Sequence, residues 1–122
     1  MKNKDKNLRT LSEDLLGQSV EVTATNAGAA IPTSADVVNC IGITGQVGYK
    51  IILPEPVIGK KLTLINASGF TFALVSSTPA SIEINGGKGA VSLAVATAKV
   101  CECKCVSLTN WVVEVLDYTA AS

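Results

Sequence analysis

Histidine is absent from the 122 residues of the chain, so the sequence lacks the commonest general base and the commonest zinc ligand. Serine and threonine are plentiful, but no imidazole is present to activate them as nucleophiles. Carboxylates are scattered singly along the chain, and no pair stands out as a general acid and base. We therefore expect that the protein is not an enzyme, with no catalytic residue and no cofactor.

Charge and long apolar runs are also scarce. Charged residues make up 16% of the chain, and its ten basic side chains balance its ten acidic ones. This balance gives no broad attraction to nucleic acid or to an anionic membrane. No run approaches the ~20 apolar residues of a membrane-spanning helix, and no apolar segment of a signal peptide follows the basic start MKNKDKN. We expect a soluble protein made in the cytosol, with its four cysteines reduced and with neither nucleic acid nor membrane as a partner.

The first 18 residues differ from the rest of the chain, because they hold seven of the twenty charges and the only helix-like pattern. Thr10 and Glu13 fit a capping box, and the leucines that follow helical spacing are Leu8, Leu11 and Leu15. A helix of two or three turns is marginal alone in water, so these leucines need a neighbour. The neighbour is either this domain, with a packed or frayed terminus, or another chain that an N-terminal arm would grip.

From residue 19 onward the pattern has a period of two, as in a strand with one buried face. After the first strand pattern at 19–25, others cover 36–43, 47–53, 61–66, 70–76, 81–85, 90–95, 98–106 and 111–118. Short links with turn residues separate them, and the NGGKG stretch at 85–89 has the composition of a hairpin loop. Because parallel pairing needs crossovers of about a dozen residues or more, residues 19–122 predict one all-β domain, an antiparallel, jelly-roll-like sandwich.

Three cysteines alternate with charged residues in CECKC, residues 101–105. On a strand they share one face while Glu102 and Lys104 share the other, so we expect a buried stripe of Cys101, Cys103 and Cys105. Neighbours on one face of a strand lie roughly 6.5 Å apart, which is too far for a disulfide, and the two-residue spacing departs from that of zinc sites. A metal site and oxidised pairing with Cys40 are the less favoured alternatives, and a metal-dependent redox protein is the corresponding function.

Aromatic residues number five, and a sugar-binding platform would need one or two of them exposed in a groove. Phe72 and Trp111 fall within strand patterns, so we expect them to fill the core. The turn after the cysteine strand is SLTN, residues 107–110, and Trp111, Val113 and Val115 then continue the buried face.

The segment from residue 51 to 115 carries the most specific pattern in the chain. It runs IILPEPVIGKKLTLINASG, then SIEINGG, then VSLAVATAKVCECKCVSLTNWVV. This pattern resembles the small β-modules of tailed-phage virion proteins, with a strand ending in Leu-Pro-x-Pro, a Leu-x-Leu-x-Asn-x-Ser-Gly hairpin, an Ile-Asn-Gly-Gly turn and a closing Thr-Asn-Trp. Such modules occur in head decoration (cement) proteins, head fibres and tail fibres. The resemblance supplies no active site.

The resemblance implies a virion structural protein on the capsid exterior, synthesised in the host cytoplasm. A single compact module with a short arm fits a decoration protein better than a fibre. The implied partners are two further copies in a homotrimer and the major capsid protein. We expect the arm to dock on the shell through Leu8, Leu11, Leu15 and Leu16. The alternative is a head-fibre or tail-fibre adhesin module that binds a host-surface glycan.

Overall fold

The computed structural model of the protein describes residues 18–43, 48–86 and 92–119. All regular secondary structure in these ranges is β-strand, which confirms the all-β class. The strands are β1 (Ser19–Thr23), β2 (Ala29–Ala30), β3 (Val37–Ile41), β4 (Lys50–Ile52), β5 (Lys61–Asn66), β6 (Phe72–Val75), β7 (Glu83–Ile84), β8 (Leu93–Val95), β9 (Lys99–Ser107) and β10 (Asn110–Asp117). None of these ranges contains a helix able to span a bilayer.

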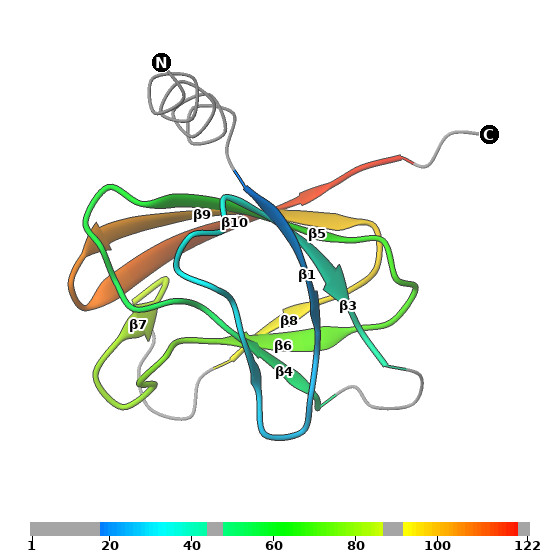
Figure 1. The fold of residues 1–122 in the computed structure, drawn as a ribbon, viewed down its shortest axis with the longest axis horizontal. Helices are drawn as coiled ribbons and strands as arrows, with labels where there is room; N and C mark the ends of the chain where they lie inside the picture. The colour runs from blue at the N-terminus through cyan, green and yellow to red at the C-terminus, as the bar shows by residue number, and fades with distance from the viewer. Residues whose placement is uncertain (1–17, 44–47, 87–91, 120–122) are drawn as a thin grey trace, which may run out of the picture.

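The ten strands form two sheets that lie as two layers (Figure 1). One sheet has six strands in the order β1-β3-β5-β9-β10-β7, and the other has four in the order β2-β4-β6-β8. The chain alternates between the layers up to β9, and β10 then returns beside β9 as a hairpin. Each of the nine predicted strand patterns overlaps one observed strand. The sequence pattern missed β2, which spans two small residues.

Both sheets are mixed, so the prediction of a wholly antiparallel domain is wrong. Within the described ranges, five of the eight ladders are parallel: β1 with β3, β3 with β5, β2 with β4, β4 with β6, and β7 with β10. The antiparallel ladders join β5 with β9, β9 with β10, and β6 with β8. The jelly-roll order of strands is therefore not confirmed.

The physical reason lies in which strands are neighbours along the chain. Short links do exclude parallel pairing of consecutive strands, but consecutive strands here lie in opposite sheets. The link from β1 to β3 is residues 24–36, and the link from β3 to β5 is residues 42–60, so each crossover includes a strand of the other sheet. For the same reason the segments after β5 and after β7 are not hairpins, because each joins the six-stranded sheet to the four-stranded one.

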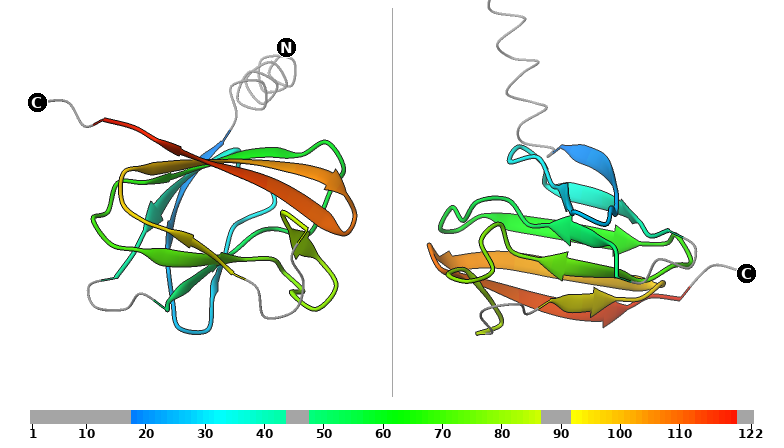
Figure 2. Two further views of the ribbon diagram at one scale, coloured as in Figure 1. Left: turned by 180° about the vertical axis from the view of Figure 1, so that it is seen from behind. Right: turned by 90° about the horizontal axis from the view of Figure 1, so that it is seen from below.

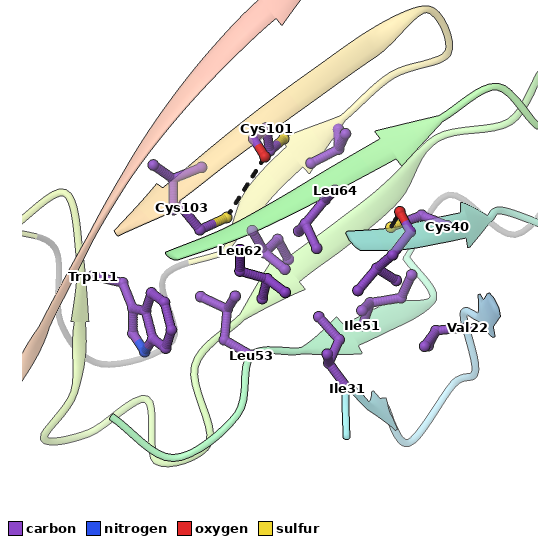
Figure 3. Packing of buried hydrophobic residues seen from close by; sticks show 14 of the residues in the cluster. Val22, Ile31, Cys40, Ile51, Leu53, Leu62, Leu64, Cys101, Cys103 and Trp111 are labelled. Atoms are coloured by element: carbon purple, nitrogen blue, oxygen red, sulfur yellow. Dashed lines mark hydrogen bonds between the residues drawn. The ribbon is translucent and has the colours of Figure 1, made fainter. Parts of the chain in front are cut away.

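The core lies between the sheets and is built from the inward side chains of both. Val38, Leu62 and Leu64 from one sheet meet Ile51 and Leu74 from the other, and each of these side chains is at most 1% exposed. Figure 3 shows this packing, with Ile51 and Leu53 below Leu62 and Leu64. The two-residue alternation read from the sequence is thus realised as one buried face per sheet.

Candidate interaction surface

The cysteine triplet lies in the core, as the alternation predicted. Cys101, Cys103 and Cys105 are 0%, 2% and 1% exposed, while Glu102 and Lys104 point outward from the same strand. The Cys103 thiol donates a hydrogen bond to the backbone oxygen of Cys101 at 4.0 Å (Figure 3). Neither these three cysteines nor Cys40 forms a disulfide.

Burial controls the protonation of three of these thiols. Loss of hydration raises the pKa of Cys40 to about 12 and that of Cys101 to about 11, and it also raises the pKa of Cys103. Over the described part of the chain, no three His, Cys, Asp or Glu side chains are grouped closely enough to hold a metal ion. The four buried cysteines therefore act as small apolar side chains of the core.

The aromatic side chains include both buried and exposed rings. Trp111 and Phe72 are fully buried, which confirms their predicted place in the core. Phe70 is 39% exposed and lies in the turn between β5 and β6, next to the backbone of Gly42. One half-exposed ring gives little of the flat aromatic surface that sugar recognition uses.

The outward face of β5, β9 and β10 carries side chains in chemically distinct rows, and we call it the striped face. These three strands run side by side along one surface of the molecule (Figure 2). Rows here are side chains brought opposite one another by the strand register. The first row is apolar and consists of Leu116, Val100 and Ile65. The second row is acidic, with Glu114 and Glu102 next to Thr63, and the third is basic, with Lys104 and Lys61 next to Val112. A fourth position on β9 is occupied by Val106.

Like charges lie directly opposite each other twice on this face. Glu114 is paired in register with Glu102, and Lys61 is paired with Lys104. The Thr63 hydroxyl donates to the Glu102 carboxylate at 3.0 Å. A shallow hollow of about 340 Å³ lies over these charged side chains, with Val106 and Val112 also on its lining. The acidic and basic rows make no ion pair with each other in the described ranges, although they occupy adjacent positions.

A second surface lies at the end of the molecule where β9 turns into β10, and we call Val57, Ile58 and Leu108 the hairpin-end patch. Their side chains are 61%, 64% and 63% exposed, the highest values among the large apolar residues described. Gly59 donates its backbone N–H to the oxygen of Cys105, and the Cys105 N–H donates to the oxygen of Lys60, both at 2.9 Å. These bonds hold the 57–60 turn against β9, so the exposed side chains stand on an ordered support.

That turn depends on a glycine. Gly59 has a φ of 89°, in the left-handed region that residues with a Cβ adopt at a cost. The Lys60 N–H closes the turn on the Val57 oxygen at 2.9 Å. The sequence marked this stretch as a turn because of its prolines and glycine, but gave no signal that its apolar side chains would face outward.

The predicted docking residues Leu8, Leu11, Leu15 and Leu16 lie outside the described residues, as does the predicted helix. The described chain starts at Gln18, whose N–H donates to the Asp36 carboxylate at 2.9 Å. Asp36 and Val37 in turn donate their N–H groups to the Gln18 oxygen at 2.8 and 3.0 Å. The pKa of Asp36 is lowered most by the hydrogen bond from the Gln18 N–H and next by Lys60, whose Nζ lies 3.1 Å from Asp36 Oδ1. Gln18, at which residues 1–17 join the domain, is therefore held by hydrogen bonds to Asp36 and Val37 at the start of β3.

Comparison with known proteins does not assign a function to this chain. A scan against protein-family models finds no match, and a search of curated proteins finds no significant relative.

Proposed function

We propose that the protein is a structural component of a phage virion, a capsid decoration protein that binds the outer shell as a homotrimer and stabilises it. The pattern from residue 51 to 115 supports the virion assignment through its resemblance to small phage β-modules. The observation that carries the docking role is the hairpin-end patch. Three large apolar side chains more than 60% exposed at one end of a small domain are typical of a protein contact.

The patch is suited to binding because it is already ordered in the free chain. The hydrogen bonds between the 57–60 turn and β9 fix its backbone, so less entropy is lost when a partner covers it. The leucines of residues 1–17 would add a second contact to the shell. Their junction at Gln18 is anchored to Asp36, so the arm would transmit its binding to a rigid domain.

The proposed mechanism needs no chemistry beyond association. Packaged DNA strains the boundaries between capsid subunits, and a protein that binds the closed lattice better than the opened one shifts the equilibrium toward the closed state. A trimer multiplies each contact by three, and linked contacts bind far more tightly than separate ones. Low charge on the domain also suits a protein whose surface is largely covered by neighbours.

The proposal is tested with shells assembled from the major capsid protein encoded in the same genome. Purified protein is mixed with shells, and co-sedimentation and shell melting temperature are measured. We expect the wild type to co-sediment and to raise the melting temperature. The double variant Ile58→Ser, Leu108→Ser and the deletion of residues 1–17 are each expected to remain folded and to lose binding. Val115→Ser, at the other end of β10 and 38% exposed, is the matched control and is expected to bind normally.

Two results would contradict the proposal. Shell binding unchanged by both the patch variant and the deletion would remove the docking surfaces proposed here. A failure of the wild type to bind shells, together with selective binding on a glycan array and a low copy number per virion, would favour the fibre-adhesin alternative.

A further inference from the structure

We propose that the striped face binds the striped face of a second copy of the chain, related by a two-fold axis that lies in the face between the acidic and basic rows. This contact is separate from the hairpin-end patch and from the arm, and it does not depend on the virion role. Its chemistry is carried by Glu102 and Lys104 on the central strand β9.

The order of the rows is self-complementary. Along β9 the outward side chains are Val100, Glu102, Lys104 and Val106, which read apolar, acidic, basic and apolar. A two-fold axis across the strands reverses this order on the partner. On β9, Val100 of each copy then faces Val106 of the other, and Glu102 of each copy faces Lys104 of the other. A rotation that keeps the rows in the same order would put lysine on lysine, so the charges select one orientation.

The isolated chain carries a cost that this pairing removes. Like charges directly opposite each other on neighbouring strands are destabilising, and the face has two such pairs, Glu114 with Glu102 and Lys61 with Lys104. In the proposed dimer the basic row of one copy lies over the acidic row of the other, which places Lys104 over Glu102 and Lys61 over Thr63, beside that glutamate. The hollow between the charged rows leaves room for these side chains to interdigitate.

Shape also agrees with a sheet-to-sheet contact. Sheets pack face to face at about 10 Å with strands crossing at about 30°, and the outer face of β5, β9 and β10 is an open sheet surface. Three strands about 4.8 Å apart and four rows about 6.8 Å apart give a projected face of roughly 400 Å² per copy. That area is at the low end for specific interfaces, so we expect a weak, concentration-dependent association.

The test uses the full-length protein and charge exchange on β9. Sedimentation equilibrium is measured from ~10 µM to ~1 mM at low and high salt, a range chosen for a weak interface. We expect the weight-average mass to rise with concentration from that of the smallest species toward twice that value. The association is expected to be weaker at high salt. Lys104→Glu and Glu102→Lys are each expected to raise the dissociation constant about tenfold or more, because both symmetry-related pairs become repulsive. Glu55→Lys, an exposed charge change outside the face, is the control and is expected to leave association unchanged.

The decisive measurement mixes the two single variants. On the outward face of β9, one variant then has two glutamates and the other has two lysines. Every facing charge pair on β9 in the mixed dimer is attractive, and we expect the mixture to associate although each variant alone does not. A misfolded variant could not give this recovery. The proposal is overturned if the mixture fails to associate, if wild-type association is insensitive to both variants, or if association appears after deletion of residues 1–17 and not before, since that segment would then be the occupant of the face.

Discussion

The buried side chain of Asn66 joins the end of β5 to two other segments, and its truncation tests how the two sheets are held together. Asn66 is fully buried. Its Nδ2 donates to the backbone oxygens of Phe70 at 2.8 Å and Val95 at 3.0 Å. Its Oδ1 accepts from the backbone N–H and the hydroxyl of Ser68, at 3.2 and 2.7 Å. Because Val95 is in β8 of the four-stranded sheet, the amide bridges the two layers.

Asn66→Ala removes all four of these hydrogen bonds. A buried acceptor left without a donor costs about 1–3 kcal/mol, and a hydrogen bond whose partner can reach water costs about 0.5–1 kcal/mol. The Val95 oxygen is buried and belongs to the first class, while the partners on Phe70 and Ser68 are nearer the surface. One bond of the first class and three of the second together predict a loss of about 2.5–6 kcal/mol, a large share of the roughly 5–15 kcal/mol stability of a small domain.

Urea unfolding followed by the fluorescence of the single tryptophan, Trp111, measures this loss. Asn39→Ala is the matched control, because Asn39 is exposed on β3 and makes one long hydrogen bond, 3.5 Å, to Glu21. We expect the control to change the free energy of unfolding by about 0.5 kcal/mol or less. A loss below about 1 kcal/mol for Asn66→Ala would refute the reasoning that this amide holds the layers together.

Three further predictions concern the core, a close backbone contact and the surface. Burial raises the pKa of Cys40 and Cys101 above the ordinary value of 9.0, so the stability that comes from their neutral forms is complete below pH 9 and is lost as pH rises toward 11–12. Between pH 8 and pH 10 the free energy of unfolding is expected to fall by about 2–3 kcal/mol more in the wild type than in the double variant Cys40→Ala, Cys101→Ala; an equal fall in both would contradict this cause. Gly42→Ala is expected to cost about 1–3 kcal/mol because its Cβ would lie 2.5 Å from a backbone oxygen, whereas Gly48→Ala, with nothing within 4 Å, is expected to be neutral; similar thermal melts for the two would oppose this. Leu108→Ser is expected to leave the free energy of unfolding in urea within about 0.5 kcal/mol of wild type, and a larger loss would show that this side chain supports the fold rather than a partner.

The sequence determined which residues face inward along most of each strand, although Val115, expected on the buried face, is 38% exposed near the end of β10. The alternation that starts at Ser19 and returns in CECKC is a property of the extended backbone, whose side chains point to opposite faces in turn. It therefore predicted the burial of Cys101, Cys103 and Cys105, and the placement of Trp111, without knowledge of any pairing partner. The turn at 107–110 was also predictable, because both of its strands lie in the same sheet.

The tertiary structure alone decided which strands are neighbours. Periodicity of two is the same in parallel and antiparallel ladders, so nothing local showed that consecutive strands alternate between sheets and that their second neighbours pair in parallel. The striped face has the same origin. The sequence predicted that Glu102 and Lys104 share the face of one strand opposite the cysteines. Their alignment with Glu114 and Lys61 arises because the strand register places three strands of different sequence side by side. Side-chain direction is a local property of the backbone, whereas pairing and surface pattern arise between segments far apart in the chain.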